Sequence, residues 1–270
     1  MIKNTISRIY PLLAVTFAAV LVSLVVVASC SPYHSMQLKE DPHSSRDRPP
    51  TDAFVIVSIS TSITADKCDP PTENCLAIID ELPPIKSKKT GSGMALWHEG
   101  KVYIITAEHV CSDEDEPSHF KYPDKDIRIK LKVNSRFYVT GVDGVPQETK
   151  VVSLNKDMDL CALDATNFKG GSISLALGPP RIGDRVYALA APYGLGGESL
   201  SLIFEGYYSG YRNSRHYYTL PTRPGSSGAL VLNQNWRAVG SLHTAFVPLE
   251  NVGIGAGWQD IKLFLESINR

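Results

Sequence analysis

Short runs rich in β-branched and aromatic residues follow one another from residue 53 to residue 254, separated by Gly, Pro, Asn and Asp turns. Many short strands at this spacing predict an all-β protein built from barrels. In the first half the expected strands are Phe54–Ile59, Met94–Trp97, Lys101–Thr106, Ile127–Val133, Phe137–Val142, Lys150–Leu154 and Leu160–Leu163. In the second half they are Ile173–Leu177, Arg185–Ala190, Ser199–Tyr207, Ala229–Leu232 and Ala238–Leu242.

Two features divide this strand pattern. Segment 166–172 contains Asn, Lys and two glycines, so we expect it to link two halves of the domain. Near the end of the chain Trp258, Ile261, Leu265 and Ile268 recur at helical spacing, which predicts an amphipathic terminal helix. The predicted parts of the domain are 52–168, 169–257 and 258–270.

The first thirty residues determine the expected compartment. Lys3 and Arg8 precede an uncharged apolar run that extends from Leu12 to Ser29. This length lies at the boundary between the core of a secretion signal and a membrane-spanning helix. In either case the rest of the chain is expected outside the cytosol.

The segment Val27-Ala28-Ser29-Cys30 resembles a bacterial lipobox, in which the cysteine is acylated and becomes the new amino terminus. The resemblance implies lipid attachment at Cys30, a membrane partner, and a location in the periplasm or at the cell surface. An uncleaved signal anchor within residues 1–30 is the open alternative. Residues 31–51 are rich in Ser, Pro, His and charge, which predicts a flexible tether. The net charge of −1 gives no reason to expect a nucleic-acid partner.

Three segments carry the side chains that nucleophilic catalysis by serine requires. A serine hydroxyl needs an imidazole to accept its proton and a carboxylate to orient that imidazole. Ser227 lies in Gly225-Ser226-Ser227-Gly228, His109 follows Thr106-Ala107-Glu108, and Asp159 precedes the apolar run Leu160–Leu163. The glycines around Ser227 permit a sharp turn that can aim backbone amides at an oxyanion.

The order of these motifs resembles the trypsin-like (chymotrypsin-fold) serine endopeptidases, particularly the bacterial and HtrA-like branch, over residues 52–258. The resemblance implies two six-stranded antiparallel β-barrels with the active site between them and a C-terminal α-helix. It implies that His109 is the general base, Asp159 its orienting carboxylate and Ser227 the nucleophile of an acyl-enzyme reaction. The amides of Gly225 and Ser227 would form the oxyanion hole, and protein or peptide would be the substrate. No metal or other cofactor is expected.

Alternatives to this interpretation stay open at two points. Asp157 is a rival to Asp159, although the family's carboxylate comes immediately before the apolar strand, which favours Asp159. The chain could also be an inactive relative that binds peptides as a chaperone-like surface lipoprotein. The acidic run Asp113–Glu116 is expected to be a solvated loop rather than a calcium site, because it lacks the glycine spacing of a recognised calcium loop.

The residues around the nucleophile also suggest a specificity. From Gly206 to Leu249 the chain has no Asp or Glu, so a basic substrate side chain would find no counter-charge in this stretch. Thr222 and His243 resemble the threonine and histidine with which glutamyl endopeptidases and potyviral and picornaviral proteases hold Glu or Gln before the scissile bond. The alternative is that His243 caps a strand and Thr222 lies in a loop.

The remaining predictions concern Ser226 and the cysteines. In animal relatives the residue at Ser226 is an Asp that pairs with a newly released amino terminus, so serine predicts activity without zymogen cleavage. Cys68 and Cys75 bracket a turn-rich loop that a disulfide could close, whereas their spacing is too long for a zinc knuckle. Many animal relatives bridge a cysteine at the position of Cys111 to a partner near residues 91–95, where this chain has none. Cys111 and Cys161 are therefore predicted to be free and buried.

Overall fold

The computed structural model describes residues 47–69, 75, 78–79, 81–112, 119–121, 128–249 and 251–268. The predicted leader 1–30 with Cys30, most of the tether 31–51 and the acidic run Asp113–Glu116 lie outside the described residues. Within the described ranges no helix has the length and apolar character needed to cross a membrane.

The first half of the domain forms one sheet, whose strands are β1 (Phe54–Asp69), β2 (Ile85–His98), β3 (Lys101–Thr106), β4 (His119–Lys121), β5 (Arg128–Thr140), β6 (Pro146–Thr149), β7 (Val151–Asn155), β8 (Leu160–Asp164) and β9 (Ile173–Ser174). The main path runs β4-β5-β1-β2-β3-β8-β7, with β6 on β5 and β9 on β2. The short helix α3 (Glu108–Cys111) follows β3 directly.

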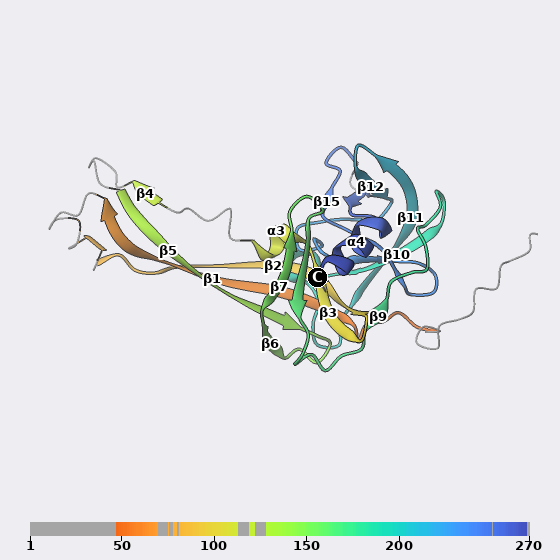
Figure 1. Cartoon of the computed structure of the whole chain (residues 1–270), viewed down its shortest axis with the longest axis horizontal. Helices are drawn as coiled ribbons and strands as arrows, with labels where there is room; N and C mark the ends of the chain where they lie inside the picture. The colour runs from red at the N-terminus through yellow and green to blue at the C-terminus, as the bar shows by residue number, and fades with distance from the viewer. Residues whose placement is uncertain are drawn as a thin grey trace, which may run out of the picture. The chain divides into compact units, whose positions relative to one another are not determined.

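The second half forms a separate sheet of seven strands in the order β14-β13-β10-β11-β12-β16-β15. Its strands are β10 (Arg185–Ala190), β11 (Leu202–Arg212), β12 (Arg215–Tyr218), β13 (Leu230–Leu232), β14 (Ala238–Ser241), β15 (Thr244–Ala245) and β16 (Gly253–Gly255). The short 3₁₀ helix η2 (Pro192–Gly194) follows β10, and α4 (Trp258–Ile268) ends the described chain. The all-β class, the two antiparallel sheets and the terminal helix are confirmed (Figure 1).

The strand counts are nine and seven rather than six and six. The first sheet has more strands because β4 and β6 were not expected and because β9, which was expected in the second half, pairs with β2. In the opposite sense, the break predicted between residues 133 and 137 does not occur. Asn134 and Ser135 continue the pairing of β5 with β1, opposite Ser62 and Thr61. Polar residues do not end a strand when the neighbouring strand supplies its hydrogen bonds, and here two expected strands become one.

The cores explain how the two halves are held together. One apolar cluster joins the first sheet to the second, because Leu96 and Ile105 share it with Leu230 and Leu232. Helix α4 contributes its buried face to this same cluster through Ile261, Phe264 and Leu265. The helix therefore packs at the junction of the halves, although it follows the second half in sequence. A second cluster, which includes Val186, Tyr218 and Val231, lies within the second sheet.

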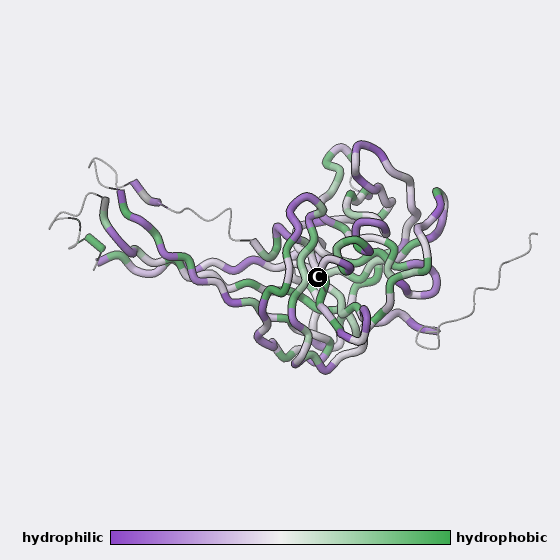
Figure 2. Tube along the Cα trace, in the orientation of Figure 1, coloured by the Kyte–Doolittle hydropathy of each residue, from purple (hydrophilic) through white to green (hydrophobic). Residues whose placement is uncertain are grey.

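Strands β1, β2 and β5 continue beyond the packed body of the domain as a three-stranded ribbon, defined here as residues 58–69, 85–90 and 128–138 (Figure 1). Hydrophilic and hydrophobic residues alternate along it (Figure 2). A bulge between Ala65 and Lys67 shifts the register of β1 against β5 near the outer end. The predicted disulfide between Cys68 and Cys75 is confirmed at this end.

Candidate active site

His109 is positioned by the way β3 leads into α3. The hydroxyl of Thr106 at the end of β3 donates to the Ser92 carbonyl on β2 at 2.7 Å, which fixes the start of the turn. The backbone is extended at Ala107 and becomes helical at Glu108. Val110 and Cys111 are buried, whereas the His109 side chain is 45% exposed. The helix thus presents one imidazole at the surface of a rigid sheet.

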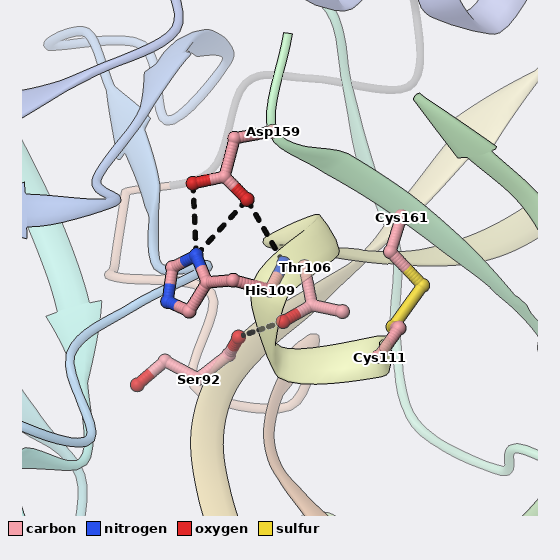
Figure 3. The surroundings of a disulfide bond; sticks show 6 residues. All are labelled: Ser92, Thr106, His109, Cys111, Asp159 and Cys161. Atoms are coloured by element: carbon pink, nitrogen blue, oxygen red, sulfur yellow. Dashed lines mark hydrogen bonds and ion pairs between the residues drawn. A yellow bond between two sulfur atoms is a disulfide. The ribbon is translucent and has the colours of Figure 1, made fainter. Parts of the chain in front are cut away.

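Asp159 meets this imidazole from the turn between β7 and β8. His109 Nδ1 lies 2.9 Å from Asp159 Oδ1 and 2.8 Å from Oδ2, and the His109 amide donates to Oδ1 at 3.0 Å (Figure 3). Asp159 itself has a φ of 50°, a left-handed conformation that Asp tolerates better than most residues. The amide of Met158 donates to the Asn155 side chain at 3.0 Å, which stabilises the turn. The carboxylate that contacts His109 is therefore Asp159, while Asp157 is an exposed turn residue.

The electrostatics of the pair favour an ionised carboxylate. Burial by itself raises the pKa of Asp159, but the hydrogen bond from the His109 side chain and the attraction of His243 outweigh it. The pKa of Asp159 therefore lies below its ordinary value. An ionised Asp159 keeps a proton on His109 Nδ1, so that Nε2 is left as the basic nitrogen.

The turn that carries Ser227 packs directly on the segment that carries His109. A Cβ added at Gly228 would lie 2.2 Å from the Thr106 hydroxyl and 2.7 Å from the Ala107 amide nitrogen, at a φ of 87°. A Cβ added at Gly225 would lie 2.5 Å from the Ala191 carbonyl, at a φ of 93°. Both glycines are thus required by close backbone approach as well as by conformation. The Ser227 carbonyl accepts a hydrogen bond from Ser92 N at 2.8 Å, which ties the turn to β2.

The hydroxyl of Ser227 donates to the backbone carbonyl of His243 at 2.8 Å. His243 follows β14, the strand that pairs with β13 just beyond the nucleophile turn. Ser227 is therefore in contact with the second sheet through its side chain and with the first sheet through its backbone. Rotation about one side-chain bond is the movement that would release Ser227 Oγ from this carbonyl.

The amides predicted to form the oxyanion hole have no partner within the described part of the chain, because neither Gly225 N nor Ser227 N donates a hydrogen bond there. The carbonyls of the two peptide bonds that contain these amides, those of Pro224 and Ser226, do accept hydrogen bonds. The Pro224 carbonyl accepts from Tyr193 N at 2.6 Å, and the Ser226 carbonyl accepts from Ala229 N at 3.1 Å. Since N–H and C=O point in opposite directions across a trans peptide, these bonds turn both amides away from the contacts that hold the loop.

The imidazole of His243 lies against Asp159, a contact that the sequence did not predict. Its Nδ1 is 3.4 Å from Asp159 Oδ2, and only 10% of the side chain is exposed. Burial lowers the pKa of His243 to about 4, against the opposing attraction of Asp159. His243 Nε2 has no hydrogen-bond partner among the described residues. At neutral pH His243 is therefore a neutral imidazole whose Nδ1 lies beside the Asp159 carboxylate.

Thr222 is also buried, and its hydroxyl donates to the Leu220 carbonyl at 3.2 Å. No hydrogen bond or ion pair joins Thr222 to His243 within the described ranges. The structure thus brings His243 to the Asp159 carboxylate, while Thr222 bonds to its own chain two residues away. The spacing of Thr222 and His243 from Ser227 in the sequence does not determine in which direction each side chain points. It could therefore not predict that His243 contacts Asp159 or that Thr222 bonds to Leu220.

The prediction that Cys111 and Cys161 are free is wrong, because they form a disulfide with Cα atoms 6.5 Å apart (Figure 3). Their predicted burial is confirmed, with 4% and 0% exposed. The animal relatives place the partner of this cysteine near residues 91–95, whereas in this chain the partner lies on β8. Cys161 lies two residues after Asp159 and Cys111 two after His109, and β8 pairs with β3 so that Cys161 is opposite Thr106. The sheet that joins His109 to Asp159 therefore also joins the two sulfurs.

A hollow at the surface borders the His109–Asp159 pair, and its lining comes from both halves. Lys156, Asp157 and Met158 of the β7–β8 turn face Arg215, Ile254 and Asp260 across it. His243 lines it as well, whereas Ser227 does not. The hollow therefore reaches His109 and Asp159 rather than Ser227.

Two antiparallel β-sheets with a His–Asp pair beside a Gly-Ser-Ser-Gly turn define the serine endopeptidases as the class of this protein. A family model described as a trypsin-like peptidase domain matches residues 91–240, which is more than half of the chain. The chain therefore belongs to the trypsin-like peptidase family. No curated protein matches it.

Solved structures resemble this chain at low identity. A serine endoprotease from Yersinia pestis is 19% identical with a TM-score of 0.51, over 86% of this chain and 68% of that one. The Rv3671c protease from M. tuberculosis in its active form is 14% identical with a TM-score of 0.55, over 86% and 92%. The Ser343Ala mutant of Rv3671c is 16% identical with the same TM-score, over 86% and 95%. At such identities the likeness is one of fold.

Proposed function

We propose that this chain hydrolyses peptide bonds with Ser227 as nucleophile, His109 as general base and Asp159 as the carboxylate that orients the base. The observation that carries the proposal is the pair of contacts between His109 Nδ1 and the Asp159 carboxylate, beside the turn that holds Ser227. A bidentate contact of this kind selects the tautomer whose Nε2 can accept a proton.

The reaction begins when Ser227 Oγ leaves the His243 carbonyl and turns to His109 Nε2. As Oγ attacks the substrate carbonyl carbon, its proton passes to Nε2, and the carbonyl π electrons move onto oxygen. The amides of Gly225 and Ser227 donate to that oxyanion. Collapse of the intermediate breaks the C–N bond, and His109 gives its proton to the leaving amine. Water, deprotonated by His109, then releases the acyl group and restores the Ser227 hydroxyl.

A substitution at the nucleophile tests this proposal. We expect Ser227→Ala to abolish labelling by a fluorophosphonate and to lower cleavage of an unfolded protein by at least about 10⁴-fold, because no other hydroxyl in the turn is assigned to the base. Ser226→Ala is the matched control, since Ser226 is buried beside it and its Oγ accepts from Arg223 N at 3.3 Å. Unchanged labelling of Ser227→Ala would refute the assignment. Persistent peptide binding without any acyl-enzyme in the wild-type protein would favour the chaperone-like alternative.

The preference for Glu or Gln before the scissile bond stays a prediction. It is supported by the absence of acidic residues from Gly206 to Leu249. The contact of His243 with Asp159 and the bond of Thr222 to Leu220 give it no further support. Cleavage-site profiling of a peptide library decides the matter, because cuts after Lys, Arg or large apolar residues contradict the preference.

We also propose that the enzyme is exported and held at a membrane by residues 1–30, through acylated Cys30 or an uncleaved anchor. Two disulfides in the described part of the chain support an oxidising compartment. Incorporation of labelled palmitate that is lost in Cys30→Ser would establish the lipoprotein form. Membrane association without incorporation would indicate the signal anchor.

A further inference from the structure

The ribbon has one strongly basic face. Strands β1, β2, β4 and β5 carry nine Lys or Arg residues, while the only acidic residues in these strands are Asp66 and Asp69. In β5 the basic side chains occur at alternate positions, and alternate residues of a strand share a face. These residues of β5 are Arg128, Lys130, Lys132 and Arg136.

Strand pairing adds the neighbouring strands to the same face, because directly paired residues point to the same side of a sheet. Ser60 lies between Lys88 on β2 and Arg136 on β5, and Ser62 pairs with Lys86. Beyond the bulge Lys67 is opposite Lys130, and at the outer edge Lys121 of β4 is opposite Arg128. We call this set the basic face; its members are Lys67, Lys86, Lys88, Lys121, Arg128, Lys130, Lys132 and Arg136.

All eight members of the basic face are exposed, and none forms an ion pair with another described residue. The opposite face of the ribbon differs in kind, since Ile59, Ile63 and Ile129 on it are at most 4% exposed. Like charges directly opposite one another destabilise a pair of strands. Lys67 with Lys130 is such a pair, so the ribbon retains a repulsion that an external anion would relieve. Arg128 lies between Lys121 on β4 and Asp69 on β1.

From these observations we propose that the basic face docks on anionic lipid headgroups. Each Lys or Arg near an anionic bilayer contributes roughly 1 kcal/mol of attraction. The apolar leader in the first thirty residues would hold the domain within reach of such a surface.

The test is a lysine-acetylation footprint of the full chain, read by mass spectrometry, on vesicles of phosphatidylcholine with or without phosphatidylglycerol. Because the leader can anchor the chain to both kinds of vesicle, only docking of the face distinguishes them. We expect acetylation of Lys86, Lys88 and Lys132 to slow by at least about fivefold on the anionic vesicles, and about 0.5 M salt to reverse it. Lys101 and Lys169, which lie outside the ribbon, should react at the same rate on both.

A charge-neutralised variant provides the matched comparison. Replacing Lys86, Lys88, Lys132 and Arg136 by Gln should remove the protection of the remaining Lys67 and Lys130. Replacing Lys101, Lys150, Lys169 and Arg181 by Gln changes the net charge equally and should leave that protection intact. Thermal melts of both variants, followed by circular dichroism, check that each is folded.

Several results would overturn the proposal. Equal acetylation on the two kinds of vesicle would do so, as would equal loss of protection in the two variants. Protection by a short DNA duplex at concentrations where anionic vesicles give none would assign the face to nucleic acid. Slow acetylation without any vesicle would mean that another part of the chain, such as the acidic run Asp113–Glu116, already covers it.

Discussion

Ser92 connects more of the active site than any residue that the sequence motifs pointed to. Its Oγ donates to the Gly225 carbonyl at 2.8 Å and accepts from Ala191 N at 2.9 Å. Its backbone N–H donates to the Ser227 carbonyl, and its own carbonyl accepts the Thr106 hydroxyl. One fully buried serine on β2 thus holds the nucleophile turn, the loop after β10 and the start of the His109 segment.

Removing the Ser92 hydroxyl should therefore weaken both stability and catalysis. In Ser92→Ala the Gly225 carbonyl and the Ala191 amide lose a buried partner, at a cost of about 1–3 kcal/mol in the free energy of unfolding. We expect kcat to fall more than KM rises, because the oxyanion amides lose their support. Denaturant unfolding and steady-state kinetics on a peptide ester check the two effects. Ser60→Ala on the exposed ribbon is the control, and an unchanged kcat in Ser92→Ala would contradict this role.

His243 makes stability depend on pH. Its pKa is about 4 in the folded protein and about 6.5 when unfolded, so the unfolded chain binds more protons between these values. The contribution of a neutral buried His243 is fully present above pH ~6.5 and is lost as the pH falls toward ~4, by roughly 3 kcal/mol. The lowered pKa of Asp159 acts in the same direction at lower pH.

The comparison of wild-type protein with His243→Asn isolates this effect, because an amide can donate to Asp159 without titrating. Urea unfolding at a series of pH values should show a difference between the two proteins that changes by about 3 kcal/mol across this pH range. A difference that stays constant with pH would contradict a neutral, buried His243.

At the scale of elements, the Cys111–Cys161 disulfide fastens α3, which carries His109, to β8, which directly follows Asp159. The sequence separation closed by this disulfide is 50 residues, against 7 for Cys68–Cys75 at the end of the ribbon. In the chain-entropy account a longer closed loop stabilises more. The Cys111–Cys161 disulfide therefore supports the His109–Asp159 pair, whereas the Cys68–Cys75 disulfide lies at the outer end of the ribbon.

Replacing both cysteines of one bridge by alanine distinguishes these roles. Loss of Cys111–Cys161 should cost about 2–5 kcal/mol of unfolding free energy and lower kcat, since the His109–Asp159 geometry loses its covalent support. Loss of Cys68–Cys75 should leave kcat within about twofold, because that bridge touches no residue of the site. Thermal melts and active-site titration measure both. Equal loss of kcat in the two variants would refute the distinction.

At the scale of the whole molecule, α4 makes the two halves one cooperative unit. Phe264 is fully buried in the cluster that both sheets share. We expect Phe264→Ala to cost about 3–5 kcal/mol and to lower the transition of both halves together. Unfolding followed by tryptophan fluorescence and by far-UV circular dichroism should still give coincident curves. Two separate transitions in the wild-type protein would contradict this cooperativity.

The sequence was informative where chemistry or periodicity is local. The Cys68–Cys75 bridge follows from residues close together, and the α4 helix follows from one repeated spacing. The contact of Asp159 with His109 was expected only from the resemblance to the trypsin-like endopeptidases. The hydroxyl network of Ser92, the orientation of His243 and the Cys111–Cys161 bridge depend instead on which strands become neighbours. The alternation of polar and apolar residues along a strand does not reveal that β3 pairs with β8. It also does not reveal that β5 continues through Asn134 and Ser135.

His109 and Asp159 come from the first half of the domain, whereas Ser227 precedes β13 of the second. A nascent chain that contains only the first half therefore has His109 and Asp159 but does not yet have the Ser227 hydroxyl. In the proposed mechanism, peptidase activity therefore requires that the second half has been synthesised and has packed against the first.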